Sequence, residues 1–271
     1  MRVWLITGAA GGLGGAFARA ALDSGDQVVA TARDAAALGS LQARGALTLS
    51  HDVADRAAAF TTVDRALDRF GRIDVAVNNA GYAIHGAIEE LTEAEMRAQL
   101  ETNFFGALWV CQAVLPAMRA RRSGRILNIS SAAGGVGFPM VGAYSASKFA
   151  LEGMSECLAL ECAPFGISVT IVAPSDFRTG FRDACRKRSR PLEAYEEAFA
   201  ANLEALSAAH SGEESGDPDR AAAAVLEMLR REPAPLRQLL GNMAFERLGA
   251  HHRRQLEEWA AYESLARSAD G

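Results

Sequence analysis

The sequence predicts an α/β fold: a single doubly wound, parallel β-sheet flanked by helices, within one domain of residues 1–271. Three observations indicate this fold. Short apolar runs recur without the alternation of a half-exposed strand, so we expect both faces of each strand to be covered. Helical stretches separate these runs, as in the right-handed βαβ crossovers of parallel sheets. Apolar residues make up 49% of the 271 residues, a composition typical of a globular protein with a substantial core.

Six strands and five crossover helices are expected in the first two thirds of the chain. Each strand is a short run of mainly β-branched or other apolar residues; these runs lie at 3–7, 28–31, 46–49, 73–77, 125–129 and 167–172. The helices are expected at 14–24, 35–44, 55–70, 91–122 and 144–163. Gly25, Gly71 and Gly166 follow three of these helices, where glycine commonly ends a helix, and Pro116 is expected to kink the fourth.

Two later parts of the chain depart from this alternation. Residues 177–211 are charged and helical in pattern and lack strand signals, so we expect a helical lid over the substrate site. A helix at 218–231 and a short apolar run at 236–240 follow the predicted lid. Residues 242–271 are expected to form a C-terminal helical tail.

Charge and cysteine content argue against several classes of protein. The net charge of −5 disfavours a protein that mainly binds nucleic acid or an anionic membrane. The cysteines lack zinc-site spacing, so we expect reduced thiols and no metal; they are Cys111, Cys157, Cys162 and Cys185. The N-terminus lacks the apolar region of a signal peptide, and no stretch approaches the roughly 18 apolar residues of a membrane span. We therefore expect a cytoplasmic protein.

A glycine-rich turn directly follows the first predicted strand and opens the first helix. Its sequence is Thr7-Gly8-Ala9-Ala10-Gly11-Gly12-Leu13-Gly14-Gly15. Glycine allows a tight turn and the close approach of a pyrophosphate, and the helix N-terminus supplies free N–H groups. The turn therefore predicts a Rossmann-like nucleotide site. Two spacings remain open, because positions 8, 12 and 14 fit TGxxxGxG whereas positions 8, 11 and 14 fit TGxxGxxG.

Five further motifs follow in order along the chain. They are Asn78-Asn79-Ala80-Gly81, Asn103, the pair Ser130-Ser131, the YxxxK pattern of Tyr144 and Lys148, and the segment from Pro174 to Thr179. With the glycine turn, they resemble the short-chain dehydrogenase/reductase family over residues 2–179 and, more loosely, over 218–241. The length favours the compact oxidoreductase branch of that family, to which the TGxxxGxG spacing belongs. One departure is Ser175, which stands where glycine is usual.

The resemblance implies four catalytic residues: Asn103, Ser131, Tyr144 and Lys148. Tyr144 and Lys148 are four residues apart, so they project from one face of a helix. The Lys148 ammonium is expected to lower the pKa of the phenol, so that Tyr144 can donate or accept a proton. Ser131 stands thirteen residues before Tyr144, the family's spacing, and is expected to hydrogen-bond the substrate oxygen. Asn103 would anchor a water molecule in a proton relay from Lys148.

The resemblance also implies a nicotinamide cofactor. NAD users of the family commonly end the second strand in an acidic residue, whereas this chain has Arg33, which can pair with a 2′-phosphate. We therefore expect NADP(H), while NAD(H) stays open because Asp34 is adjacent. The expected cofactor contacts are Gly8, Ala10, Gly11, Gly12, Leu13, Gly14, Arg33, Asp52, Val53, Asn79, Ala80, Gly81, Tyr144, Lys148, Pro174 and Thr179.

These observations predict an NADP(H)-dependent oxidoreductase that transfers a hydride between nicotinamide and a carbonyl or secondary alcohol. We expect a homo-oligomer, either a dimer or a tetramer. An NAD-dependent alcohol dehydrogenase of the same family and a catalytically silent nucleotide-sensing regulator are the alternatives. An epimerase or dehydratase is disfavoured by the length and by the NNAG motif.

For each of two groups of side chains near the predicted lid, the sequence allows two interpretations. The basic run is either a solvated helix face or a guide for an anionic substrate; it consists of Arg178, Arg182, Arg186, Lys187, Arg188 and Arg190. An aromatic and Met group is either an apolar substrate wall or ordinary core; it consists of Phe138, Met140, Phe177 and Phe181. His85, His251 and His252 lack further metal-binding neighbours and are expected at the surface.

Overall fold

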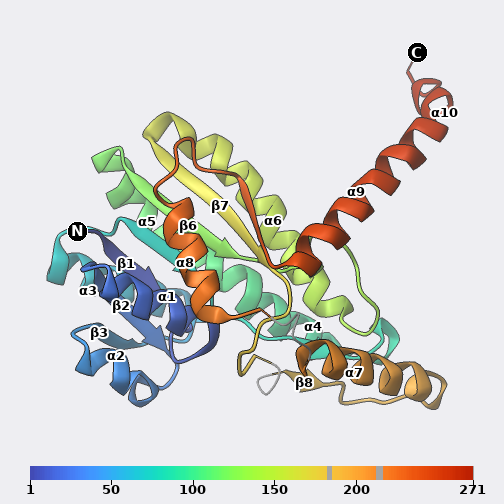
Figure 1. Ribbon diagram of the computed structural model, residues 1–271, viewed down its shortest axis with the longest axis horizontal. Helices are drawn as coiled ribbons and strands as arrows, with labels where there is room; N and C mark the ends of the chain where they lie inside the picture. The colour runs from blue at the N-terminus through green and yellow to red at the C-terminus, as the bar shows by residue number, and fades with distance from the viewer. Residues whose placement is uncertain (182–184, 212–215, 271) are drawn as a thin grey trace.

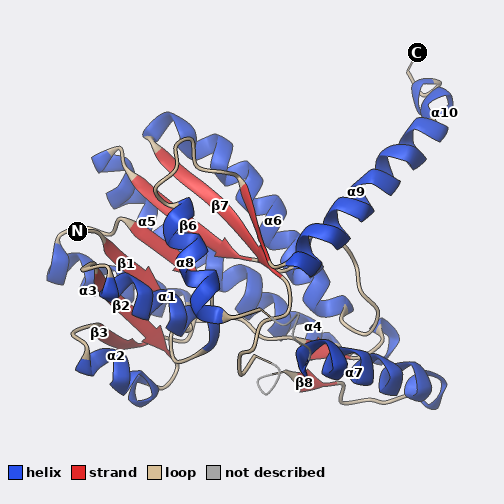
Figure 2. Cartoon of the chain, in the orientation of Figure 1, coloured by secondary structure: helices blue, strands red, loops and turns tan. Residues whose placement is uncertain are grey.

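Seven parallel strands form the central sheet. A computed structural model describes residues 1–181, 185–211 and 216–270. The strand order is β3-β2-β1-β4-β6-β7-β9 (Figure 2), and every neighbouring pair is parallel. The strands are β1 Val3–Ile6, β2 Gln27–Ala32, β3 Leu47–Ser50, β4 Val75–Asn78, β6 Gly124–Ile129, β7 Ile167–Pro174 and β9 Arg237–Leu240. The predicted doubly wound sheet is confirmed, and the apolar run at 236–240 supplies its edge strand.

Helices cover both faces of this sheet (Figure 1). The helices α1 (Gly12–Asp23) and α8 (Pro218–Met228) lie on one face. The helices α3 (Arg56–Phe70), α5 (Gly106–Arg121) and α6 (Gly142–Cys162) lie on the other. Successive strand residues point to opposite faces, so Trp4 and Ile6 pack in the core with α1 and α8, whereas Leu5 packs in the core with α3 and α5.

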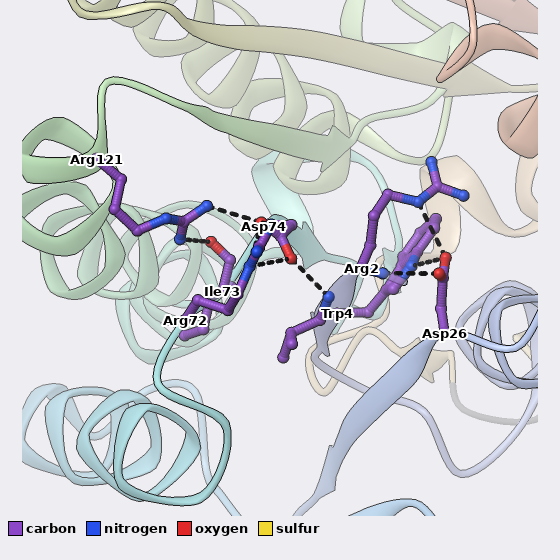
Figure 3. Close-up of polar contacts among 8 residues, drawn as sticks. Arg2, Trp4, Asp26, Arg72, Ile73, Asp74 and Arg121 are labelled. Atoms are coloured by element: carbon purple, nitrogen blue, oxygen red, sulfur yellow. Dashed lines mark hydrogen bonds and ion pairs between the residues drawn. The ribbon is translucent and has the colours of Figure 1, made fainter.

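Two buried aspartates tie the amino ends of the strands together (Figure 3). Asp74 accepts a 2.8 Å hydrogen bond from the backbone N–H of Val3, and Asp26 accepts a 2.9 Å hydrogen bond from the indole of Trp4. The arginines that pair with these carboxylates are Arg2, Arg72 and Arg121. Burial raises the pKa of both carboxyl groups, but the hydrogen bonds and arginine charges outweigh it and hold both pKa values below their ordinary range. This network lies at the end of the strands opposite to the glycine turn.

The long helix expected at 91–122 is divided in the structure. Helix α4 covers Glu93–Leu100, a π-helical turn covers Glu101–Phe105, and α5 continues from Gly106, with Pro116 inside it. A π-helical turn changes the direction in which its side chains point and often lies at a functional site. Asn103 is in the middle of this turn.

The insertion at 177–211 is not wholly helical, so this part of the expectation is wrong. Arg186–Lys187 form strand β8, which pairs in parallel with β5 (Ile84–His85). Two backbone hydrogen bonds hold this pair together. The N–H of Arg186 donates to the carbonyl oxygen of Ala83 at 2.9 Å, and the N–H of Arg188 donates to the carbonyl oxygen of His85 at 2.8 Å. A helix follows as expected, α7 (Glu196–Ser211), and lies next to β8 beyond α4 (Figure 1).

The C-terminal tail is helical, as expected. It consists of α9 (Asn242–Ala261) and the short α10 (Glu263–Arg267), and it projects away from the rest of the molecule (Figure 1). Along the part of the chain that the structure describes, no helix is both long enough and apolar enough to cross a membrane.

Candidate active site

The candidate site lies at the carboxyl edge of the sheet, between β1 and β4. The order of the strands reverses there, because β2 and β3 lie on one side of β1 whereas β6, β7 and β9 lie beyond β4. The loops after β1 and β4 therefore diverge and leave the crevice in which open α/β sheets bind ligands. The glycine turn follows β1, and the segment 78–81 spans the end of β4 and the start of its loop.

The glycine turn resolves the two spacings that the sequence left open. Gly8 and Gly12 have φ angles of 65° and 55°, in the left-handed region that favours glycine. A Cβ atom on Gly14 would lie 2.5 Å from the carbonyl oxygen of Gly8. Gly11 has an extended backbone, and a Cβ atom there would meet nothing within 4 Å. The structure therefore requires glycine at positions 8, 12 and 14, which is the TGxxxGxG spacing.

The N-terminus of α1 suits a phosphate group. Its N-cap residue is Gly11, which has no side chain to accept hydrogen bonds from the first turn, and that turn contains no acidic residue. Uncapped N–H groups and the positive end of the helix dipole attract anions. Thr179 lies beside the turn, 3.4 Å from the position of a Cβ atom on Gly12. The residues present therefore fit the pyrophosphate of a dinucleotide.

Asn79 holds the loops after β1 and β4 together. Its side-chain amide donates hydrogen bonds to the carbonyl oxygens of Thr7 at 2.9 Å and Gly8 at 3.0 Å. The Thr7 hydroxyl in turn accepts hydrogen bonds from the backbone N–H groups of Asn79 and Ala80. Both amide hydrogens of Asn79 are used inside the protein, so this side chain fixes the shape of the crevice.

The ends of β2 and β3 carry the residues expected near the adenosine. Arg33 is exposed directly after β2. Asp34, which left the cofactor choice open, accepts a 2.9 Å hydrogen bond from the N–H of Ala36 and caps the following helical turn. After β3, Asp52 is exposed and Val53 is buried. Of the two charged residues at the end of β2, Asp34 thus acts as a helix cap, whereas the Arg33 side chain does not.

Tyr144 and Lys148 lie on one face of α6, as their spacing predicts. The Lys148 ammonium is 5.7 Å from the centre of the Tyr144 ring and donates a 2.7 Å hydrogen bond to the carbonyl oxygen of Ile129. Burial raises the pKa of Tyr144 to about 12, although a hydrogen bond with Ser131 opposes this shift, and burial lowers the pKa of Lys148 to about 8. The expected lowering of the phenol pKa is wrong for this structure, because the removal of the phenolate from water is the largest effect on this group.

The two serines after β6 face in different directions. The Ser131 side chain reaches the Tyr144 hydroxyl and also accepts a 3.1 Å hydrogen bond from the N–H of Ala133. The Ser130 hydroxyl donates a 2.6 Å hydrogen bond to Glu152. Neighbouring residues of an extended segment alternate in direction, so Ser131 alone of this pair faces Tyr144.

Asn103 is buried, and its amide is fully engaged. Its Nδ2 donates to the carbonyl oxygen of Tyr82 at 2.9 Å and to the hydroxyl of Ser147 at 3.0 Å, while its Oδ1 accepts from the N–H of Tyr82 at 3.1 Å. The Ser147 hydroxyl donates to the carbonyl oxygen of Tyr144 at 2.7 Å. Asn103 therefore connects the loop after β4 to the first turns of α6.

Sequence reasoning missed two members of this arrangement. Gln99 is fully buried; it donates to the carbonyl oxygen of Tyr82 at 2.7 Å and accepts from the N–H of Ile84 at 2.8 Å. Ser147 carries the link from Asn103 to α6. A polar residue on an otherwise apolar helix face is a weak signal for such a role, and the sequence alone does not show its partner.

Comparison with known proteins decides the family. The family described as short chain dehydrogenase matches residues 2–190. The chain belongs to the short-chain dehydrogenase family. It is 38% identical to the oxidoreductase BOA17 of Botryotinia fuckeliana, over 92% of each chain. It is 40% identical to a 3-ketodihydrosphingosine reductase of Bacteroides thetaiotaomicron, over 89% of this chain and 88% of that one.

Solved structures of other dehydrogenases share the fold. One from Streptomyces avermitilis superposes with a TM-score of 0.93 at 41% identity over the whole of both chains. One from Burkholderia phymatum in complex with NAD gives a TM-score of 0.81 at 26% identity, covering 94% and 95% of the chains. An alcohol dehydrogenase from Thermococcus sibiricus complexed with 5-hydroxy-NADP gives 0.73 at 25% identity, covering 89% and 96%. This short-chain dehydrogenase is thus an oxidoreductase of a family whose members bind NAD or NADP.

A buried arginine fastens the segment predicted to form a lid to the rest of this short-chain dehydrogenase. Arg188 forms ion pairs with Glu90 at 2.7 Å and with Glu196 at 2.8 Å, and its guanidinium lies 3.6 Å from the centre of the Phe199 ring. Gly86 leaves room for this side chain, because a Cβ atom there would lie 2.7 Å from that of Arg188. Arg188 is therefore part of the lid's own packing, and neither earlier reading of the basic run applies to it.

The other basic residues of the lid differ from Arg188. Arg186 is exposed, with its guanidinium 4.8 Å from the centre of the Tyr82 ring, and Arg178 lies 3.6 Å from Asp217. Lys187 and Arg190 are exposed, and Arg182 lies outside the described residues. The run is not a helix face, because its middle is strand β8.

The expected apolar wall is divided between core and site. Phe177 is buried in the core with α1 and α8. Phe181 is exposed, with its ring centre 5.9 Å from that of Tyr144. Phe138 and Met140 are half-buried, and Phe138 lies beneath an arginine of α9. His85, expected at the surface, is half-buried in β5.

Proposed function

We propose that this short-chain dehydrogenase is an NADP(H)-dependent carbonyl reductase that also oxidises the corresponding secondary alcohol. The observation that carries the proposal is the grouping of Ser131, Tyr144 and Lys148 at the edge of the crevice that the glycine turn opens. Such a grouping provides a proton donor, a second hydrogen bond and a positive charge around one substrate oxygen.

Tyr144 is the general acid and base. Its pKa of about 12 keeps the phenol protonated at neutral pH, so Tyr144 gives its proton to the carbonyl oxygen during reduction. When bound, the nicotinamide supplies the hydride to the carbonyl carbon. Oxidation requires Tyr144 to lose its proton first, so the raised pKa favours reduction at neutral pH.

Ser131 and Asn103 prepare the site for this proton transfer. The Ser131 hydroxyl, which contacts Tyr144, hydrogen-bonds the substrate oxygen and stabilises the charge that develops on it. Asn103 fixes the loop after β4 against the start of α6, so that Tyr144 and Lys148 keep their positions. Lys148 places a positive charge near the phenolate that forms during reduction.

Arg33 supports the preference for NADP(H). It is exposed at the end of β2, where the adenosine ribose lies in a dinucleotide crevice of this kind, and a guanidinium pairs with a phosphate through two hydrogen bonds. Asp34 is engaged as a helix cap, so its carboxylate has a local partner. Both features favour a cofactor with a 2′-phosphate over one with a ribose diol.

A ketone attached to an apolar chain is the substrate class that we propose. Phe181 exposes its ring next to Tyr144, on the lid that follows β7. A relative at 40% identity is named 3-ketodihydrosphingosine reductase, which is consistent with a ketone substrate.

Cofactor oxidation by the purified full chain tests the proposal. The reduced cofactor, NADPH or NADH, is followed by absorbance with aliphatic ketones of increasing chain length, aromatic ketones and keto acids. We expect turnover with NADPH at least about tenfold faster than with NADH at subsaturating cofactor. Faster turnover with NADH would support the NAD-dependent alternative. Tight NADPH binding without turnover in either direction would support the silent regulator.

A further inference from the structure

The C-terminal helix α9 exposes large apolar side chains far from the rest of the protein. From Leu256 to its end every residue of α9 is exposed, and the helix axis leaves the body of the molecule (Figure 1). Trp259 is 63% exposed, and Leu256, Tyr262 and Leu265 are exposed to a similar extent. Side chains of this size rarely form a contiguous exposed group on a monomer, so such a group indicates a binding surface.

These apolar residues follow the spacing of a helix that packs against another helix. Phe245 and Trp259 are fourteen residues apart with the polar His252 midway between them, and Leu248, Leu256 and Tyr262 extend the same face at intervals of three or four. A repeat of seven residues keeps one stripe facing a partner helix along its length. The helix α9 is therefore built as one half of a helix pair.

In the second half of α9 the charged residues are segregated along the axis, whereas Glu246 and Arg247 are neighbours near its base. Arg253 and Arg254 stand immediately before the middle of the stripe, and Glu257 and Glu258 stand immediately after it. A second copy of the helix in antiparallel orientation brings the arginines of one copy level with the glutamates of the other. A parallel orientation would bring like charges together, which is unfavourable.

A hollow at the base of α9 lies where the end of an antiparallel partner would arrive. It has a volume of about 550 Å³ and is lined by residues that include Leu239, Phe245, Leu248 and Gly249. With the two-fold axis between Gln255 and Leu256, Tyr262 of the second copy lies level with Gly249. The hollow therefore offers an apolar seat for that ring.

We propose that α9 pairs with α9 of a second copy of this chain, antiparallel and around a two-fold axis close to Leu256. Such a contact is self-complementary, as two-fold interfaces are. The balance of three arginines and three glutamates in α9 argues against a membrane surface as the occupant, because helices that lie on membranes carry an excess of basic residues.

Charge reversal and charge exchange test this pairing. The mass of the full chain in solution is measured by light scattering after gel filtration for wild type, R253E/R254E and the exchanged variant R253E/R254E/E257R/E258R. We expect R253E/R254E to halve the mass of the assembly, because four glutamates of each copy then face four of the other. The exchanged variant should restore the wild-type mass. Unchanged mass in R253E/R254E, or no restoration on exchange, would overturn the proposal.

Cross-linking tests the position of the axis in the same protein. Under mild oxidation, Leu256→Cys should give a covalent dimer, because the two copies of residue 256 adjoin. Leu265→Cys should not, because antiparallel pairing separates the two copies by about 28 Å at 1.5 Å per residue. Wild type controls for the native exposed Cys157. A dimer from Leu265→Cys but not from Leu256→Cys, or binding of α9 to phosphatidylcholine–phosphatidylserine vesicles by a monomeric chain, would contradict the pairing.

Discussion

The hydroxyl of Ser130 donates a 2.6 Å hydrogen bond to the buried carboxylate of Glu152, which lies one helical turn beyond Lys148 on α6. The other oxygen of this carboxylate accepts a 2.7 Å hydrogen bond from Arg237 of β9. Gly134 leaves space for this carboxylate, because a Cβ atom at position 134 would lie 2.4 Å from Glu152 Oε1. Glu152 is thus fixed in position near Lys148, and its charge raises the pKa of Lys148 against the larger, opposing effect of burial.

Glu152 is therefore expected to set the pH range of the enzyme as a positioning residue. If reduction requires the Lys148 ammonium, kcat/KM for ketone reduction falls as the pH rises through about 8, where this group loses its proton. Glu152→Gln removes the favourable charge, so the fall should move to lower pH by about one unit. The measurement is the pH profile of kcat/KM from pH 6 to 10.

Glu156→Gln is the matched control for this prediction. Glu156 also pairs with Arg237, at 2.9 Å, but it is half exposed and one turn further from Lys148. Its profile should coincide with that of wild type. If Glu152→Gln lowers kcat/KM equally at every pH and does not shift the profile along the pH axis, Glu152 has a purely structural role.

Gly12→Ala should destabilise the protein, whereas Gly11→Ala should not. An alanine at position 12 must adopt a φ of 55°, which costs about 1–2 kcal/mol, whereas position 11 is extended and open. The measurement is the free energy of unfolding from urea denaturation of both variants. Equal losses at the two positions would contradict the assignment of the TGxxxGxG spacing.

Arg188→Leu should loosen the lid. The substitution leaves Glu90 buried without its cation and removes the stacking on Phe199, so the segment from Arg186 onward loses its attachment. We expect KM for the ketone to rise about tenfold, with a smaller change in kcat, because closure of a lid contributes to substrate binding. Limited proteolysis should show faster cleavage within residues 185–195.

The control for the lid is Lys187→Ser, because Lys187 is the exposed neighbour of Arg188 and the last residue of β8. This variant should keep both the KM and the cleavage rate of wild type. A similar rise in KM for both variants would indicate that positive charge, and not the Arg188 attachment, serves the substrate.

Arg33→Ala should weaken the binding of NADPH but not of NADH. The loss of a charge-assisted hydrogen-bonded pair corresponds to about 1.5–3 kcal/mol, or roughly a ten- to hundredfold higher Kd for NADPH. Calorimetric titration with both cofactors measures it, with Arg44→Ala, an exposed arginine paired with Asp23, as the control. Tighter binding of NADH than of NADPH by wild type would refute the proposed cofactor preference.

The doubly wound sheet and the positions of most helices could be predicted from the sequence because they depend on local pattern. Apolar runs such as residues 3–6 are buried on both faces, and glycine at position 71 ends a helix with a φ of 72°, as its place in the sequence indicates. Each of these features depends only on residues that are close together in the sequence. The right-handedness of the crossovers then leads to the doubly wound architecture.

What the sequence could not show depends on contacts between distant segments. Arg188 looked like one member of a basic run, yet it is buried because Glu90, about a hundred residues earlier, meets it. No particular amino-acid pattern marks the π-helical turn at Asn103, so the sequence alone does not predict it. The pKa of Tyr144 was expected to fall, because the distance to Lys148 can be inferred from spacing, whereas the burial of the phenol cannot.

The rate of hydride transfer in Tyr144→Phe tests the central claim most directly. The substitution removes only the hydroxyl, so Kd for NADPH should stay within about twofold of wild type while ketone reduction falls by at least about a hundredfold. Tyr195→Phe, which removes a lid hydroxyl bonded to Glu89 at the surface, should keep wild-type turnover. Retention of more than about a tenth of wild-type turnover by Tyr144→Phe, with NADPH binding intact, would show that Tyr144 is not the proton donor.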